Sequence, residues 1–198
     1  METVKTMRIA VVAYLLLLCS ISIVAQNHEL SKHITKLSEW SGQADVEDYV
    51  PEMEIVGQNI HTIWVRYVSG SEGYLYYRRS TDLGETWEAP KLIHTYTDPS
   101  WAKSFEHRKL AVEGEKVYIA TADYNYPDKG TGRIFFYESV NAGASFATGR
   151  VLSQNEGGYR HYYNSLIKVK NGKIAIAYQG ETSGIRKGTW FLYSSNGG

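Results

Sequence analysis

The sequence has almost no cysteine and no net charge. Cys19 is the only cysteine among 198 residues, and it lies inside an apolar N-terminal stretch. The rest of the chain therefore forms no disulfide, has no thiol chemistry and must be held together by packing alone. Twenty-one basic residues balance 21 acidic ones. Because no cluster of Lys and Arg is present either, we expect no nucleic-acid partner.

Signatures of cofactors and metals are also missing. There is no GxGxxG or P-loop pattern, and the six histidines show no ligand spacing such as H-x-x-x-H. Asp123, Asn125 and Asp128 offer oxygen atoms for Ca²⁺, but they lack the alternation of an EF-hand loop. We therefore expect no cofactor and no metal.

The composition is that of a globular protein rich in aromatic residues. Hydrophobic residues make up 43% of the chain and charged residues 21%, which excludes a disordered chain. Sixteen tyrosines and five tryptophans favour β structure and surfaces that stack on ligands.

Residues 1–25 are typical of a secretory signal peptide. Basic Lys5 and Arg8 precede the apolar run from Ile9 to Val24, and Ala25 is a small residue at a plausible cleavage point. The alternative is an N-terminal membrane anchor.

Lipidation of Cys19 is not expected, because a lipoprotein signal needs a small residue where Leu18 stands. The signal peptide predicts a secreted, periplasmic or cell-surface protein whose mature chain has no membrane span. Residues 26–49 then form an N-terminal segment. Within it, 28–40 has helical spacing of apolar residues, so a short helix and irregular packing both stay open.

From about residue 50 onward one four-strand pattern recurs. Two strand-like runs joined by a short turn precede a third run, a Ser- and Gly-containing turn, and a short fourth run. The predicted strands are 52–56, 60–65, 74–79 and 91–94; then 109–112, 116–121, 133–138 and 150–152; then 165–169, 173–178 and 189–193. A four-stranded antiparallel unit repeating every 40–60 residues or so indicates the blades of a β-propeller.

The turn between the third and fourth runs reads S-T-D-L-G-E-T-W at 80–87. Its Ser and Asp side chains are suited to bonding the backbone of a tight turn, and Gly84 to a positive φ. Trp87 is expected to fold over the hairpin. The motif residues of the three copies are Ser80, Asp82, Gly84, Thr86 and Trp87; Ser139, Asn141 and Gly143; and Ser194, Asn196 and Gly198.

This S-x-D-x-G-x-T-W pattern resembles the Asp-box, or BNR repeat, of the sialidase-like β-propeller superfamily. The match is complete at 80–87, degenerate at 139–146 and cut short at 194–198. The resemblance implies an all-β fold: about three four-stranded antiparallel blades, spanning 50–198, of an incomplete sialidase-like propeller. Because sialidases of this superfamily have six blades, it also implies a fragment of a longer chain. Exposed blade faces are expected to make such a fragment associate.

Strand alternation predicts which end of the blades carries a site. The 1–2 turns and the Ser-Gly turns share one end, and the longer 2–3 loops and blade connections share the other. Long loops on a rigid scaffold are the usual place for ligand sites, although they are also simply solvated loops in many proteins. Aromatic side chains beside arginines and carboxylates suit an acidic sugar. The substrate-binding candidates are Trp101, His107, Arg108, Asp123, Tyr124, Arg160 and Arg186.

Catalytic residues are only weakly indicated. The resemblance to sialidases implies three arginines on the sugar carboxylate, a Tyr–Glu nucleophile pair and an Asp acid/base. Tyr162 or Tyr163 with Glu181 is the candidate pair, and channel-lining or packing tyrosines are the alternative. The first sialidase arginine lies in a Tyr-Arg-Ile-Pro-like stretch, where this chain reads Asp48-Tyr49-Val50-Pro51. The following loop offers only Glu72 as an acid.

Three functions stay open on the sequence alone. The first is a secreted glycoside hydrolase of the sialidase type, acting on glycans with terminal acidic sugars. The second is a non-catalytic glycan-binding or adhesion propeller, and the third is a structural repeat within a larger exported protein.

Overall fold

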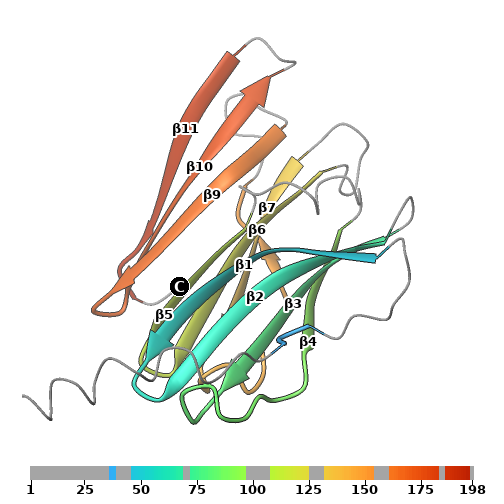
Figure 1. Cartoon of the computed structure of the whole chain (residues 1–198). Helices are drawn as coiled ribbons and strands as arrows, with labels where there is room; N and C mark the ends of the chain where they lie inside the picture. The colour runs from blue at the N-terminus through green and yellow to red at the C-terminus, as the bar shows by residue number, and fades with distance from the viewer. Residues whose placement is uncertain are drawn as a thin grey trace, which may run out of the picture. The chain divides into compact units, whose positions relative to one another are not determined.

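The computed structural model describes residues 36–38, 46–68, 72–96, 108–124, 132–153, 161–182 and 186–196. The chain divides into two units, Met1–Lys36 and Leu37–Gly198, and every described strand belongs to the second (Figure 1). None of the described residues is helical. The predicted signal peptide lies outside the described residues, and so does most of the possible helix at 28–40.

Each sheet is an antiparallel meander whose strands follow one another in chain order. The first sheet contains β1 (Val46–Val56), β2 (Asn59–Val68), β3 (Glu72–Ser80) and β4 (Lys91–Tyr96). The second contains β5 (Arg108–Glu113), β6 (Lys116–Tyr124), β7 (Gly132–Ser139) and β8 (Arg150–Val151). The third contains β9 (His161–Lys170), β10 (Lys173–Thr182) and β11 (Arg186–Ser194).

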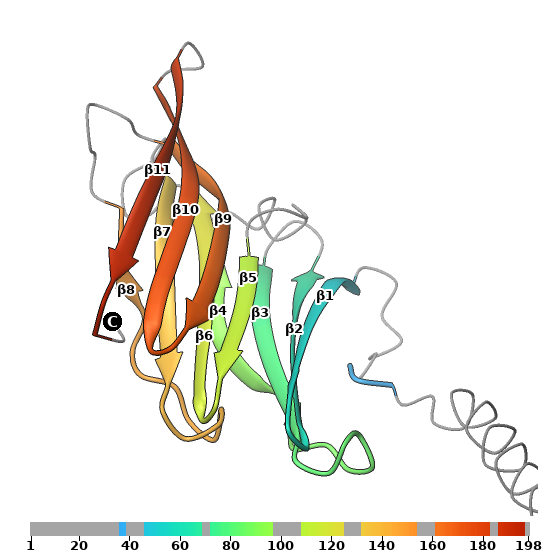
Figure 2. The same ribbon diagram turned by 90° about the vertical axis from the view of Figure 1, so that its left-hand side faces the viewer.

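The second sheet is packed on both of its faces. One face meets the first sheet in a core that includes Ile63, Val65, Leu75, Tyr77, Val117, Ile119 and Tyr137. The other face meets the third sheet in a core that includes Tyr118, Ala120, Ile134, Phe136, Ile176 and Tyr178. Because both faces are covered, β6 is buried from Val117 to Asp123 instead of alternating. Figure 2 shows the second sheet between the other two.

The first strands of the three sheets are neighbours: β1 contacts β5, and β5 contacts β9. The turns lie together at one end of the sheets. The Leu83 N–H donates to the Gln58 carbonyl at 3.0 Å, and the Ala142 N–H donates to the Glu115 carbonyl at 2.6 Å. These two Ser-Gly turns are therefore fastened to the 1–2 turns of their own sheets, as the alternation predicts. The connections at the other end lie mostly outside the described residues.

All predicted strands are present, and most are longer than expected. The largest difference is β1, which begins at Val46 and not at Glu52. Its pairing with β2 shifts register between Tyr49 and Glu52, around Pro51. Because proline has no N–H to donate to a ladder, a strand interrupted in this way is hard to read from sequence. The prediction of an all-β chain of four-stranded antiparallel sheets is confirmed.

Candidate functional site

The 80–87 turn is built on the side chains of Ser80 and Asp82. The Ser80 hydroxyl donates to Asp82 Oδ1 at 2.7 Å and accepts the Gly84 N–H at 2.8 Å. Asp82 Oδ1 accepts the Thr86 N–H at 2.9 Å, and Oδ2 accepts the Thr86 hydroxyl at 2.6 Å. The hydrogen bonds from Thr86, with a further one from Ser80, lower the pKa of Asp82 to about 2. The carboxylate is thus an organiser of the turn.

Two consecutive residues of this turn have positive φ. Gly84 has a φ of +94°, as its place in the motif predicts, and Leu83 before it has a φ of +55°. A left-handed conformation costs a non-glycine residue about 1–2 kcal/mol, which the local hydrogen bonds offset. The Trp87 ring folds back over the turn, with its Nε1–H donating to the Gly84 carbonyl at 3.1 Å.

The 139–146 turn repeats the arrangement with an amide in place of the carboxylate. The Ser139 hydroxyl donates to Asn141 Oδ1 at 2.8 Å and accepts the Gly143 N–H at 2.9 Å. Asn141 Oδ1 accepts the Ser145 N–H at 3.0 Å, while Asn141 Nδ2 donates to the Ser145 hydroxyl at 2.9 Å. The last bond runs in the opposite direction from its counterpart in the first turn, so the same shape is held without a charge.

The third copy begins in the same way. The Ser194 hydroxyl donates to Asn196 Oδ1 at 2.8 Å. Gly198 lies outside the described residues.

The second turn also docks on the first sheet. The ring of Phe146 meets the ring of Tyr77 edge-on, with 4.8 Å between centroids. Arg79 Nη1 donates to the backbone carbonyls of Asn141 at 3.2 Å and Ala142 at 2.6 Å. A turn of one sheet thus supplies part of the interface with the sheet before it.

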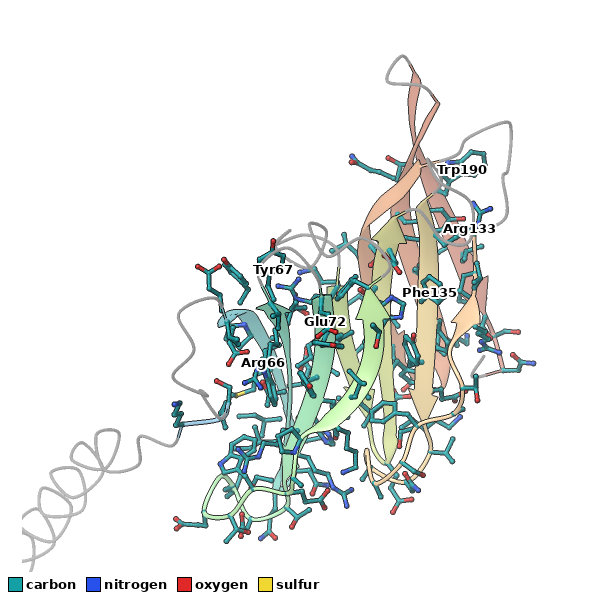
Figure 3. The ribbon with its side chains drawn as sticks, turned by 90° about the vertical axis from the view of Figure 1, so that its right-hand side faces the viewer. Arg66, Tyr67, Glu72, Arg133, Phe135 and Trp190 are labelled. Carbon is teal, nitrogen blue, oxygen red and sulfur yellow. The ribbon has the colours of Figure 1, made fainter. Side chains whose placement is uncertain are left out.

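A buried polar cluster lies in the same interface, toward the end that carries the long loops. His94 of β4 connects two groups of the second sheet. Its Nδ1 lies 2.6 Å from the Tyr137 hydroxyl, and its Nε2 lies 3.1 Å from Asp123 Oδ2. Phe135, labelled in Figure 3, packs beside the imidazole with 4.7 Å between centroids. Asp123 is fully buried and His94 is 7% exposed.

Arg108 extends this cluster at the first residue of β5. Its side chain is fully buried and hydrogen bonds with the Tyr96 hydroxyl, which lies 2.9 Å from Thr121 Oγ1. Burial lowers the pKa of the Arg108 guanidinium, and the nearby Tyr96 and Glu52 oppose that shift. Burial likewise raises the pKa of Tyr96. A buried arginine and a buried aspartate within one interface are expensive to desolvate, so their hydrogen bonds are needed to hold them there.

The structure brings together two of the predicted site residues, Arg108 and Asp123. Arg108 pairs with Thr121 in the register of β5 and β6, two positions before Asp123. Trp101, His107 and Arg160 lie outside the described residues. Tyr124, Tyr162, Tyr163, Glu181 and Arg186 lie on described strands, but only their backbone is described. In that backbone Tyr162 pairs with Gly180 and Tyr163 with Gln179, next to Glu181.

Sequence reasoning missed His94, Tyr96 and Tyr137 as partners of the two charged residues. The spacing of the histidines bears only on metal binding, which it does not favour. In β3–β4 the register pairs His94 with Leu75, so the imidazole belongs to the core-facing row. The position of His94 in the core-facing row was the sequence signal for these partners, because a buried histidine requires hydrogen-bond partners.

The described cluster is suited to supporting the loop-bearing end of the sheets. It is not suited to contacting a ligand directly. Arg108 and Asp123 do not reach the surface, yet they lie where β5 begins and β6 ends, beneath the loop-bearing end. Within the described ranges no three His, Cys, Asp or Glu side chains converge as metal ligands. Nor does any helix there have the length and apolar character needed to cross a membrane.

Comparison with known proteins gives one kind of match. No protein-family model matches the sequence, and no curated protein matches it. Among solved structures, the fold is similar to that of "Hadza microbial sialidase Hz136", with a TM-score of 0.58 and 11% sequence identity. The match covers 76% of this chain and 36% of that one. The chain therefore spans about a third of the length of the sialidase it matches.

At this identity the likeness concerns the fold alone. Together with the successive antiparallel sheets, it confirms the predicted fold class, an incomplete sialidase-like β-propeller. The three sheets are accordingly blades, with β1, β5 and β9 as their first strands.

Proposed function

We propose that this chain is part of an exported, sialidase-like protein that acts on or binds glycans with terminal acidic sugars. The observation that carries the proposal is the placement of Arg108 and Asp123 at the loop-bearing end of a sialidase-like fold. Both charges are buried beneath that end, which gives the loops above them a rigid and polar base.

The 80–87 and 139–146 turns support the same proposal. Serine, an Asp or Asn side chain, glycine and an aromatic ring play equivalent parts in the two turns. We assign both turns, and the beginning of a third at Ser194, to the Asp-box class. That assignment concerns architecture, since Asp82 is fully engaged in its own turn.

The sugar-contacting groups are proposed to be the candidates on the loop-bearing end. Arg160 and Arg186 are assigned to the sugar carboxylate, because a guanidinium binds a carboxylate through two parallel hydrogen bonds. Trp101, His107 and Tyr124 are assigned to stacking and hydrogen bonding with the sugar ring. Arg108 and Asp123 are assigned a positioning role, since both are buried.

In the hydrolase form of the proposal, a tyrosine of β9 is the nucleophile. The register places Tyr162 and Tyr163 opposite Gly180 and Gln179, beside Glu181. A phenol is a weak nucleophile until a base removes its proton, and Glu181 is the carboxylate assigned to that step.

A second candidate, a non-catalytic glycan-binding propeller, is favoured by Asp48. This residue stands in the stretch where sialidases carry their first carboxylate-binding arginine. Asp48 accepts two hydrogen bonds from Arg66, Nε to Oδ1 at 3.0 Å and Nη2 to Oδ2 at 3.1 Å. An arginine already held by an aspartate is poorly placed to hold a sugar carboxylate.

Turnover of a fluorogenic sialoside separates the two candidates, measured on a protein that contains this chain and all its blades. The hydrolase predicts turnover that falls at least about 100-fold in Tyr162→Phe or Tyr163→Phe. The binding propeller predicts no turnover but binding to sialylated glycans on an array. Binding is expected to fall at least about tenfold in the Arg160→Ala, Arg186→Ala double variant. Exposed Lys168→Ala, which also removes a cation, is the matched control. A protein that shows no turnover and also no binding to sialylated glycans would overturn the proposal.

Export has its own test. Expressed with residues 1–25 in a secreting host, the protein is expected to begin at Gln26 when its mature N-terminus is sequenced. A retained N-terminus would contradict cleavage after Ala25 and favour the membrane anchor.

A further inference from the structure

The turn between β9 and β10 consists of an asparagine followed by a glycine, Asn171-Gly172. Lys170 and Lys173 pair on either side of it, and Asn171 and Gly172 have φ values of +53° and +68°. Two central residues with positive φ form a type I′ turn, for which Asn-Gly is a preferred sequence. Asn171 is exposed, and a Cβ atom built on Gly172 would meet no atom within 4 Å. The turn therefore leaves its asparagine amide in water and open space beside its glycine.

This pair of residues can react with itself. The backbone nitrogen that follows an asparagine attacks the side-chain amide carbon and closes a cyclic imide. A side chain on the attacking residue hinders the approach, and Gly172 has none. The new bond joins Gly172 N to Asn171 Cγ, and the side-chain nitrogen leaves as ammonia, taking the proton of the Gly172 N–H. Water then opens the imide at either carbonyl, which gives aspartate or isoaspartate.

A carboxylate of the second blade holds the attacking group. Glu113, at the end of β5, accepts the Asn171 N–H on Oε1 at 2.5 Å and the Gly172 N–H on Oε2 at 2.6 Å. The attack requires the Gly172 nitrogen to turn toward the asparagine side chain and to lose its proton. The Glu113 carboxylate opposes both steps, because it fixes the N–H and its negative charge disfavours a second anion beside it.

This contact is not part of the repeated architecture. The strand registers place Val56 in the first sheet and Lys170 in the third at the position that Glu113 occupies in the second. Valine has no polar atom, and a charged lysine has no acceptor. The bonds from Glu113 to the next turn are therefore a specific addition to the boundary between the second and third blades.

We propose that Asn171 is a site of deamidation and that the Glu113 carboxylate controls its reaction. While the second and third blades are in contact at this end, Glu113 keeps the turn unreactive. When they separate, the Gly172 nitrogen is released and the asparagine is converted. The isoaspartyl product adds a methylene group to the main chain, so the two N–H groups of the turn no longer match the two carboxylate oxygens. The modified boundary therefore opens more readily than the unmodified one.

The residues that flank the turn connect it to the core. Val169 and Ile174 pair with each other and pack in the core between the second and third sheets. A displaced turn therefore moves a pair of apolar side chains out of that core. Lys170 and Lys173 are exposed beside the turn and offset the charge of a new carboxylate. The cause of the loosening is thus the altered main chain and not charge repulsion.

The test measures the rate of deamidation at Asn171 in the whole chain, by peptide mapping after incubation at mildly alkaline pH. In the folded parent, the rate is expected to be at least about tenfold lower than in the same chain unfolded in urea, where the bonds to Glu113 are absent. Glu113→Gln keeps the shape of the side chain but removes its charge. This variant is expected to react about three- to tenfold faster than the parent, since it loses a charge-assisted hydrogen bond.

Two controls belong to the same experiment. Glu115→Gln removes an exposed carboxylate two positions further along the chain, and it is expected to leave the rate at Asn171 unchanged. The Asn196-Gly197 pair is followed in the same samples, and its rate is expected to be equal in the parent and in both variants.

Three outcomes would overturn the proposal. Equal rates in the folded and the unfolded parent would remove the control assigned to Glu113, and this comparison needs no variant. Equal rates in the parent and in a Glu113→Gln protein whose circular dichroism shows it to be folded would do the same. An Asn171 that does not react in the unfolded chain would remove the site itself.

Hydrogen exchange tests the consequence for the boundary. Parent protein in which Asn171 has reacted is separated by its extra negative charge from unreacted protein. The backbone N–H groups of β9 and β10 are expected to exchange at least about threefold faster in the reacted form, while those of β2 and β3 are unchanged. Equal exchange in the two forms would overturn the loosening of the boundary, whatever the protein does with glycans.

Discussion

A Cβ atom built on Gly143 would lie 1.8 Å from the hydroxyl of Tyr77. These residues belong to different blades, and they fit together only because position 143 carries no side chain. Gly143 also has a φ of +82°, a conformation that residues with a Cβ rarely adopt. One glycine therefore serves the turn and the interface at once.

Gly143→Ala is predicted to destabilise the protein by about 2–4 kcal/mol, measured by urea unfolding, because the backbone is strained and the Tyr77 ring must move. Gly114→Ala is the matched control, with a φ of +59° and no atom within 4 Å of its Cβ. It is predicted to cost only the ~1–2 kcal/mol of the left-handed conformation. Equal losses in the two variants would mean that Tyr77 imposes no constraint.

This contact illustrates what the sequence can and cannot predict. Ser80, Asp82 and Gly84 are close together in the sequence and bond to one another within the turn, so their spacing predicts the turn directly. The meeting of Tyr77 with Gly143 depends on how one blade sits on the next, and no local pattern contains that information. The strands were predictable for the same local reason, apart from the part of β1 before Glu52, where its pairing with β2 shifts register around Pro51.

The candidate site shows the same limit. Arg108 and Asp123 were predicted as site residues from their positions beside long loops, and the structure places both at that end. Their burial was not predictable, because it arises from the packing of β5 and β6 against the first blade. His94, the link between Asp123 and Tyr137, comes from a strand far away in the sequence.

Asp82→Asn is predicted to make the first turn resemble the second, in which Asn141 already takes this place. The folded pKa of Asp82 is about 2, below its ordinary value of 3.8. The carboxylate therefore stabilises the fold above about pH 4, and this stabilisation is lost as the pH falls through about 2. Asp82→Asn is expected to lower Tm by a few degrees at neutral pH. Between pH 4 and pH 2, the Tm of the variant is expected to fall less than the Tm of the parent. A variant as acid-sensitive as the parent would contradict this role.

His94 and Asp123 are predicted to be energetically coupled. Each single change, His94→Leu or Asp123→Leu, leaves the other group buried without its 3.1 Å partner, which is costly. The double variant removes both polar groups, so it is expected to be more stable than the sum of the two losses by ~0.5–3 kcal/mol. Urea unfolding of the four proteins measures this coupling. As a control, Lys168→Ala combined with Asp123→Leu is expected to be additive, because Lys168 is exposed on the third sheet.

His61 is predicted to make stability depend on pH between 7 and 5. Its side chain is fully buried, its Nδ1 lies 2.7 Å from the Tyr77 hydroxyl, and burial, aided by Arg79, lowers its pKa from 6.5 to about 4. The neutral ring therefore contributes stability that is complete above pH 6.5 and declines as the pH falls toward 4, because the unfolded chain takes up the proton first. The free energy of unfolding in urea is expected to fall by about 2 kcal/mol from pH 7 to pH 5.

The comparison variant for this slope is His61→Gln, which offers Tyr77 an acceptor that does not titrate. Its free energy of unfolding is expected to be lower than that of the parent at pH 7, since the glutamine fits the core less well. Between pH 7 and pH 5 it should lose about 2 kcal/mol less than the parent does. Because all other titratable groups are common to both proteins, their contributions cancel in the difference. A slope that is unchanged in His61→Gln would assign the acid sensitivity to another group and leave His61 as a neutral packing residue.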